Sequence, residues 1–489
     1  MAGLQEIISS ELVLLHAKNK IKSRQEIKEL NFDKYNFTNK EELSFKSEKG
    51  ISESTVKEIS ALKNEPEWMT ELRLKALKVF NEKPLPAWGP DLSGLNYNEL
   101  NYYLKPKAEK TRNWQEVPKE IKETFDRLGI PEAEKKYLAG SVAQYEGESI
   151  YHNIKKEWEE KGVIFTDMDT ALKEHEELIK QYFMKAVPVT DNKFSALHAA
   201  FWSGGSFLYV PENIQIDLPF QTYFRMNAES EGQFEHTLIV AEKNSKAAYI
   251  EGCTAPKHPS YSLHSAVVEI YVKENSSMRY TTVQNWSKSV YNLNTKRAIV
   301  DKNARMEWVG GSMGSFITML YPCSILRGEG ASAQHLNIAF GSGKTWKDGG
   351  AKVIHLAKNT SSNIIAKSIS MNEGRGVYRG LVRINKGAMH AKSHIQCDAL
   401  ILDEKSGSDA FPHNEVLEPT ATLAHEATVN RISDEQVFYL MSRGLSEAEA
   451  RAMIVLGFLH DVYKEIPMEF AVEFSRLVSM EMEKLGSVG

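Results

Sequence analysis

The chain has 489 residues, 42% of them hydrophobic and 26% charged, as is typical of a soluble globular protein. This length exceeds what one hydrophobic core usually supports, so we expect two or three domains. The net charge of −5 gives no reason to expect nucleic acid or an anionic membrane as a partner. No stretch approaches the ~18 apolar residues of a membrane-spanning helix.

The N-terminal segment lacks the basic region, the long apolar core and the small-residue cleavage site of a secretory signal. The three cysteines, Cys253, Cys323 and Cys397, include no CxxC pair. Few, unpaired cysteines are typical of proteins in a reducing cytosol, so the sequence predicts a cytoplasmic protein.

Residues 1–155 are expected to form an N-terminal helical domain. Apolar residues recur at helical spacing from Val56 to Leu62 and again from Trp68 to Phe80, and Pro84 ends the second pattern. A further helical pattern, with gaps, runs from Ile150 to Phe183.

Residues 156–427 are expected to form the core of a parallel β-helix. Near residue 188 the pattern changes to short alternating segments rich in Val, Ile, Thr and Tyr, without helical stretches long enough for βαβ crossovers. A small-residue turn followed by such a segment recurs every 26 to 31 residues, near Lys246, Ser277, Ala304, Ser332, Ser362 and Ala388. Repeats of this size predict a β-solenoid, with an irregular β-sandwich as the alternative.

Residues 428–489 are expected to form a C-terminal helical domain. Ser433 precedes two acidic residues, as an N-cap does, and a second helix is predicted to start at Ser446. A helical domain here would cover the strand edges that an open solenoid end exposes.

Two of the cysteines are candidates for chemistry. Gly252 and Pro256 flank Cys253 where a strand enters a loop, which favours a presented thiol; a packed small hydrophobe is the alternative. Cys397 stands 28 residues before His425, which is about one repeat, so the two could lie on neighbouring coils and share a soft metal. Glu426 points to the opposite face from His425 in an extended strand, so both could bind one metal only at a bend.

The spacing of the cysteines predicts different roles. Cys253 and Cys397 are 144 residues apart, close to five repeats, which places them roughly 24 Å apart along the solenoid. Such a distance excludes one shared cluster within a chain and suggests a relay. Cys323 is out of phase and is expected to be structural. A route between the two thiols could be lined by polar residues that otherwise would form a solvated outer face: Arg225, Asn227, Gln284, Trp286 and Lys296.

The segment Gly341–Thr345 resembles a phosphate-binding loop only superficially. The motif needs a glycine where Ile338 stands, and Trp346 follows where a helix should begin. The sequence therefore predicts no intrinsic ATP site. No local signature indicates a flavin site either.

Several segments resemble SufB, the scaffold type within the SufB/SufD family of the SUF iron–sulfur cluster assembly system. They occur in the family's order over nearly the whole chain: Asn64–Met69, Arg73–Leu77, Trp88–Gly94, Gly252–Pro256, Gln284–Trp286, His425–Ala427 and Phe438–Gly444. The resemblance implies a right-handed parallel β-helix between helical terminal domains. It also implies a complex with the ATPase SufC, docked on the C-terminal domain, and pairing of β-helix ends with SufD or a second SufB-like chain.

The resemblance also implies roles for individual residues. Cys253 would receive persulfide sulfur from a cysteine desulfurase or sulfur carrier, and the five polar residues named above would be associated with its passage. Cys397 would lie at a subunit interface where a transient iron–sulfur cluster assembles, with His425 and Glu426 as further candidate ligands. The chain departs from some relatives in having no cysteine before Cys253 and in carrying Ala424, instead of an acid, before His425.

These features predict a scaffold, not an enzyme, that builds a cluster and passes it to apo iron–sulfur proteins. An architectural SufD-like subunit is the alternative within the family. A β-helix enzyme of the polysaccharide lyase type is a third possibility, but it would usually be secreted.

Overall fold

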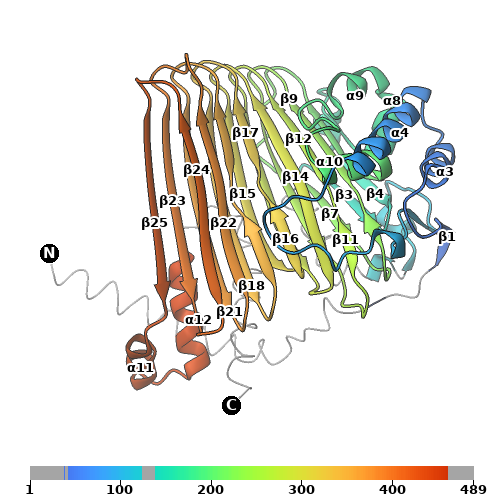
Figure 1. Ribbon diagram of the computed structural model, residues 1–489. Coiled ribbons are helices and arrows are strands. Elements are labelled where there is room, and N and C mark those ends of the chain that lie inside the picture. Colours follow the sequence, from blue (N-terminus) through green and yellow to red (C-terminus); the bar gives the residue numbers. More distant parts are fainter. Residues whose placement is uncertain (1–37, 39–41, 120, 124–137, 461–489) are drawn as a thin grey trace.

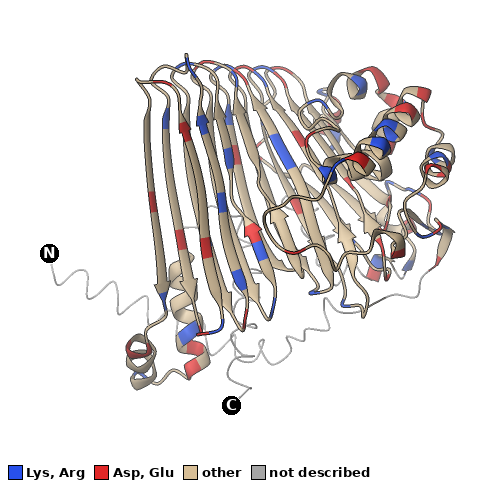
Figure 2. Ribbon diagram, in the orientation of Figure 1, with Lys and Arg blue, Asp and Glu red and all other residues tan. Residues whose placement is uncertain are grey.

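The computed structural model describes residue 38 and residues 42–119, 121–123 and 138–460 (Figure 1). The expectation about a secretory signal falls on residues outside this range, as does the part of the expected C-terminal domain after residue 460. None of the helices in the described ranges is long and apolar enough to cross a membrane. Acidic and basic residues are interspersed over both the strands and the helices (Figure 2).

The core of the molecule is a parallel β-solenoid whose coils stack side by side (Figure 1). One sheet has ten strands, and all its pairings are parallel except the terminal hairpin of β3 and β4. The order is β25 (Thr422–Arg431), β23 (Lys392–Ile401), β21 (Ser361–Met371), β18 (Ser332–Ser342), β15 (Arg305–Gly314), β13 (Ser277–Trp286), β10 (Lys246–Thr254), β7 (Phe220–Arg225), β3 (Gly140–Tyr145) and β4 (Glu148–Ile154).

The second sheet forms the facing wall of the solenoid. Its main path is β16 (Ile317–Leu320), β19 (Trp346–Gly349), β22 (Arg375–Ile384), β20 (Lys352–His355), β17 (Cys323–Leu326), β14 (Val290–Val300), β12 (Val267–Val272), β9 (His236–Ala241), β6 (Gly205–Val210) and β5 (Ile164–Thr166). Beside this path, β24 (Gly407–Val416) pairs with β22, and β11 (Ser262–His264) pairs with β14 and β8 (Gly232–Gln233). The predicted parallel β-helix is confirmed.

The repeat seen in the sequence is the register of the ten-stranded sheet. Strands begin at Lys246, Ser277 and Ser332, as the pattern predicts, and within a few residues of the other expected starts. Inward-facing rings stack from coil to coil, with centroids 5.3 Å apart for Tyr249 and Tyr280 and 5.2 Å apart for Tyr280 and Trp308. This stacking of side chains related by one repeat fixes the register of the coils.

Helices cover the N-terminal part of the solenoid on the outer side of the second sheet (Figure 1). They are α3 (Glu53–Lys63), α4 (Glu67–Glu82), α8 (Met168–Glu174), α9 (Glu176–Tyr182) and α10 (Lys193–Phe201). The short helix α7 (Lys156–Glu159) instead packs Trp158 against the apolar cluster that contains Tyr249 and Tyr280. Two short 3-10 turns (Tyr97–Glu99 and Trp114–Glu116) and a small sheet of β1 (Leu43–Lys46) and β2 (Leu104–Pro106) complete this part. The helical patterns starting at Val56 and Trp68 are confirmed as α3 and α4.

The expected boundary at residue 155 does not coincide with a change of structure. The hairpin of β3 and β4 precedes it but belongs to the solenoid sheet, and α7 to α10 follow it. Ile150 lies in β4, so the helical pattern proposed from Ile150 is wrong at its start. The reason is that β4 is buried at nearly every position, which removes the alternation that identifies a strand.

Two C-terminal helices lie against the ten-stranded sheet. They are α11 (Asp434–Ser442) and α12 (Glu447–Phe458), and they share an apolar cluster with Leu336, Ile338 and Leu400 on the outer face of the sheet. Ser446 caps α12 through a capping box with Glu449. Ser433 occupies the N-cap position of α11 without a side-chain hydrogen bond, and β25 continues four residues past the expected boundary at 427.

Candidate functional site

Cys253 lies inside the solenoid, near the end of β10. Only 1% of its surface is exposed, and it packs with Phe224, Met226 and Trp286. The expectation of a thiol presented on a loop is therefore wrong, because β10 continues through Thr254 before the chain turns. Gly252 is required here, since a Cβ at this position would lie 2.8 Å from the ring of Tyr223.

Charged groups surround this thiol although it is buried. Glu251, two residues earlier on the same strand, accepts hydrogen bonds from Lys296 Nζ at 2.9 Å and from Thr282 at 2.9 Å, and it also contacts the hydroxyl of Tyr280. Burial, followed by the nearby carboxylates of Glu251 and Glu235, raises the pKa of the Cys253 thiol well above its usual value. The thiol is therefore protonated unless a cation or an incoming group stabilises the thiolate.

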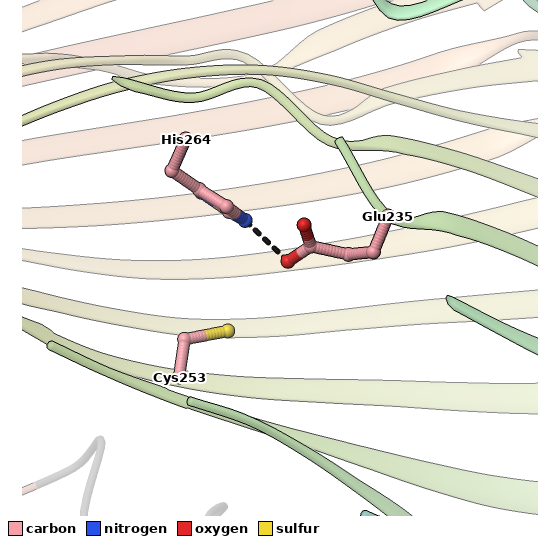
Figure 3. Close-up of side chains that lie close together, drawn as sticks. All are labelled: Glu235, Cys253 and His264. Carbon is pink, nitrogen blue, oxygen red and sulfur yellow. Dashed lines mark hydrogen bonds and ion pairs between the residues drawn. The ribbon is translucent and has the colours of Figure 1, made fainter. Parts of the chain in front are cut away.

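Two residues that the sequence analysis missed lie beside Cys253 (Figure 3). His264 contacts Glu235 through Nε2 and Asn292 Oδ1 through Nδ1, the latter at 2.7 Å. A signal for them exists in the sequence, because Glu235, His264 and Asn292 follow one another at intervals of 29 and 28 residues, which is one coil each.

The five polar residues proposed to line a route are buried in the solenoid and do not form a solvated face: Arg225, Asn227, Gln284, Trp286 and Lys296. Arg225, Gln284, Trp286 and Lys296 lie close to Cys253. Arg225 donates to Thr254 at 3.1 Å, and burial lowers the pKa of its guanidinium. Gln284 is the register partner of Cys253 on the next coil, and the ring of Trp286 lies 4.4 Å from that of His264.

Cys397 and His425 are brought together at the opposite end of the solenoid. The distance between Cys397 Sγ and His425 Nε2 is 3.4 Å, and His425 Nδ1 lies 3.4 Å from the amide of Asn414. Burial raises the pKa of Cys397 to about 12, opposed in part by the hydroxyl of Tyr378, and burial lowers the pKa of His425. A neutral imidazole beside a thiol is a pair that can bind a soft metal once the thiol loses its proton.

Glu426 does not join this pair. β25 is extended at this point, so Glu426 lies on the outer face, where its carboxylate is 3.2 Å from His394 Nε2. The bend that would bring His425 and Glu426 to one site is absent from β25 as described here. Of the three candidate metal ligands expected from the sequence, only Cys397 and His425 lie together within this chain.

A cavity lies between the two sheets and reaches the Cys397 site. Its walls carry Lys347 and Tyr378 from one sheet, and from the other they carry Thr282 and a series of small residues: Gly310, Ser312, Ala339, Ala366, Ser368, Ala399 and Ala427. Thr282 donates a hydrogen bond to Glu251 and lies on the coil next to Cys253. The cavity therefore extends from the coil next to Cys253 to Cys397 itself.

The register confirms the five-repeat separation of Cys253 and Cys397. Successive pairing from β10 through β13, β15, β18 and β21 to β23 takes five steps. Cys323 belongs to β17 in the other sheet. Its neighbour Ser324 accepts a hydrogen bond from the indole of Trp308 across the solenoid, so Cys323 points outward.

The segment Gly341–Thr345 forms the turn between β18 and β19. Thr345 Oγ1 accepts from the backbone of Ser342 at 3.0 Å, and a strand follows where a phosphate-binding loop would lead into a helix. The superficial likeness to that motif thus corresponds to a turn of the solenoid.

Comparisons with known proteins agree with this architecture. The family described as SUF system FeS cluster assembly, SufBD core domain, matches residues 224–458, and the SufBD protein N-terminal region matches residues 55–222. The chain belongs to the SufBD family of iron–sulfur cluster assembly proteins. An iron–sulfur cluster assembly SufBD family protein of Staphylococcus haemolyticus is 56% identical over 456 residues, which cover 93% of this chain and 98% of the relative. A protein of the same description from Staphylococcus aureus shows the same identity and coverage.

These comparisons place the chain in a family that takes its name from both SufB and SufD. A role in iron–sulfur cluster assembly follows from membership.

Proposed function

We propose that this chain is a SufB-type scaffold that receives sulfur at Cys253 and completes a cluster at Cys397. The single observation that carries the proposal is the contact between Cys397 Sγ and His425 Nε2 at 3.4 Å, at the end of a cavity that starts one coil from Cys253. An architectural SufD-like subunit would need neither this pair nor the cavity.

The sulfur step uses the thiolate of Cys253 as a nucleophile. It attacks the outer sulfur of a persulfide on a cysteine desulfurase or sulfur carrier, the S–S bond breaks, and the donor leaves as a thiolate. Cys253 then carries the sulfane sulfur as its own persulfide. Conversion of that sulfur to sulfide takes two electrons from an added reductant, for which a dithiol such as dithiothreitol serves in the test below.

The cluster itself needs ligands beyond this chain. Iron–sulfur clusters are usually held by four residues, whereas Cys397 and His425 provide two. Both sheets end beside this pair, because β25 pairs only with β23 and β24 only with β22 among the described strands. A second copy of the chain, or SufD, could therefore add its own ligands, and Glu426 on the outer face is available to such a contact.

Apolar side chains at this end of the molecule also favour partners. Phe438 on α11 is 72% exposed and Tyr439 is 57% exposed, although both belong to a helix that packs on the solenoid. We assign this helix to docking of the ATPase SufC, whose nucleotide state would reshape the adjacent end of the solenoid. The finished cluster would pass to apo iron–sulfur proteins in the cytoplasm.

Anaerobic reconstitution of the chain with its ATPase tests the proposal. Bound sulfane sulfur is measured first, after addition of a cysteine desulfurase with cysteine and before any reductant. Iron and dithiothreitol are then added, and cluster absorption is measured. Cys253→Ala should prevent both signals, whereas Cys397→Ala and His425→Ala should prevent only the cluster. Normal cluster formation in Cys397→Ala would contradict the scaffold role and favour the SufD-like alternative. A full cluster on an enforced monomer would contradict the shared site.

A further inference from the structure

Three buried side chains direct different donor atoms to one point inside the N-terminal half of the solenoid. Glu235, Cys253 and His264 come from three segments of the chain, and their ligand atoms lie within 4.8 Å of one another (Figure 3). Each is at most 1% exposed. The grouping is therefore a built site inside the protein and does not resemble the solvated acidic clusters common on surfaces.

The hydrogen bonds around His264 leave its Nε2 atom for this site. Asn292 Oδ1 accepts from the side-chain amide of Asn294 at 2.9 Å and lies 2.7 Å from His264 Nδ1. Since Oδ1 can only accept, Nδ1 carries a proton, and Nε2 faces Glu235 with one proton between them. Metal-binding histidines are commonly held in this way, with the second nitrogen donating to an oxygen acceptor.

Glu235 has an unused oxygen in the same place. Its Oε2 atom is buried and has no hydrogen-bond partner within the described part of the chain. Buried carboxylate oxygens without partners are costly. The neighbouring carboxylate of Glu251 differs, because it is neutralised by Lys296 and bonded to Thr282. Glu235 is thus the carboxylate that still lacks a positive partner apart from the imidazole.

The charges and distances suit a divalent cation. A thiolate, a carboxylate and a neutral imidazole carry two negative charges, so a divalent ion makes the buried site neutral. Metal–ligand bonds of about 2.0 to 2.3 Å place tetrahedral ligand atoms roughly 3.3 to 3.8 Å apart. Atoms already within 4.8 Å of one another reach this geometry through small side-chain shifts.

We propose that Glu235, Cys253 and His264 bind one divalent transition-metal cation of the Fe²⁺, Co²⁺ and Zn²⁺ class. The mixed sulfur, nitrogen and oxygen donors select this class over Mg²⁺ or Ca²⁺, which prefer oxygen ligands alone. Three protein ligands leave a fourth position open. The site is distinct from the pair formed by Cys397 and His425, five coils away, and its existence does not depend on whether Cys253 accepts sulfur.

Cobalt titration of the full-length chain tests this site without any sulfur donor or ATPase. The parent protein carries Cys397→Ser, which removes the other thiol near a histidine and leaves Cys323 as an internal control. We expect one equivalent of Co²⁺ to bind with a thiolate-to-cobalt charge-transfer absorption. Adding Cys253→Ser should abolish that absorption, and Asn292→Ala should weaken binding about 10- to 100-fold through loss of the partner of His264.

Two results would overturn the proposal. One is an unchanged thiolate absorption in the protein that carries both Cys253→Ser and Cys397→Ser. The other comes from X-ray absorption of the wild-type chain loaded with one equivalent of Zn²⁺, where a first shell without sulfur would exclude Cys253 as a ligand. The second measurement needs no variant, so it decides the matter even if Glu235→Gln or His264→Gln fails to fold. Thermal melting with and without Zn²⁺ provides the folding control.

Discussion

The two ends of the solenoid share one backbone architecture but differ in how their interior is filled. Around Cys253 the inward positions carry large or charged side chains such as Tyr249, Glu251 and Trp286, and they leave the thiol enclosed. Around Cys397 the corresponding positions carry alanine, serine and glycine, and a cavity remains. A β-solenoid has a nearly constant cross-section, so the sizes of the inward side chains decide whether a coil is solid or hollow.

Register pairing makes this contrast direct. The inward column that starts at Glu251 continues through Thr282, Gly310, Asn337 and Ala366 to Cys397. Every later side chain in this column is smaller than that of Glu251. The comparison suggests that the N-terminal coils hold Cys253 in a defined polar environment, whereas the C-terminal coils provide space for sulfur and iron.

The largest expected effect comes from filling the hollow half. Ala366→Leu places a larger side chain in the cavity, one coil from Cys397. Because it occupies existing space, we expect the free energy of unfolding to change by less than about 1.5 kcal/mol, while cluster formation falls at least tenfold and sulfur loading of Cys253 persists. The matched control is Ala424→Leu on the exposed outer face of β25. Equal cluster yields in the two variants would show that the cavity is not used.

The spacing of the two cysteine sites could be predicted from the sequence, but the burial of Cys253 could not. The repeat of 26 to 31 residues predicted the solenoid, the five-coil separation of the thiols and the different phase of Cys323, because register depends only on spacing along the chain. The burial of Cys253 could not be read from Gly252 and Pro256, since it depends on rings contributed by other coils. Glu235 and His264 were missed although their separation of 29 residues, which is one coil, was a signal in the sequence.

The sequence also could not distinguish a hollow coil from a packed one. Ala366 and Ala399 alternate inward like any core residue, and only the structure shows that a cavity remains between them and the facing sheet. For Glu426 the alternation was read correctly as opposite to His425, and the family resemblance nonetheless suggested a joint ligand set. Within a single chain, the alternation along the strand therefore predicted the directions of His425 and Glu426 better than the family resemblance did.

Because Cys253 is tightly enclosed, we expect a substitution at the neighbouring Gly252 to destabilise the protein. In Gly252→Ala the new Cβ would lie 2.8 Å from the ring of Tyr223, and the surrounding coils restrict its movement. We expect a loss of about 1 to 3 kcal/mol in the free energy of unfolding, measured by urea denaturation. Gly407→Ala is the control, because nothing lies within 4 Å of its Cβ in the open half. A similar cost for both variants would argue against tight packing around Cys253.

Two histidines should also differ in their response to pH because one is buried and the other is partly exposed. Burial lowers the pKa of His335, whose ring lies 6.3 Å from that of Trp308, to about 3, while His425 is partly exposed. The unfolded chain binds a proton at His335 near pH 6.5 and the folded chain does not, so stability is lost as pH falls from about 6.5 towards 3. The slope is up to roughly 1.4 kcal/mol per pH unit.

Urea denaturation at several pH values measures this slope. His335→Gln should flatten the dependence of the unfolding free energy on pH by close to one proton, whatever its cost at neutral pH. His425→Gln should change the slope less, because its imidazole keeps contact with solvent. A larger change of slope in His425→Gln than in His335→Gln would contradict the expectation that burial of the imidazole governs this pH dependence.

The smallest effect on stability and on cluster assembly is expected from a substitution at Cys323, which lines neither the cavity nor the surroundings of Cys253. Its thiol faces outward under the N-terminal helices, where burial raises its pKa and the guanidinium of Arg297 acts in the opposite direction. Cys323→Ser keeps the size of the side chain and offers a hydroxyl to the same neighbour, so the melting temperature should fall by no more than a few degrees. Cluster yield and sulfur loading should match wild type, because five coils of paired strands link Cys253 to Cys397 without passing through β17. A variant that melts normally but assembles no cluster would mean that sulfur or iron travels along the outside of the second sheet, and the cavity would then lose its assigned role.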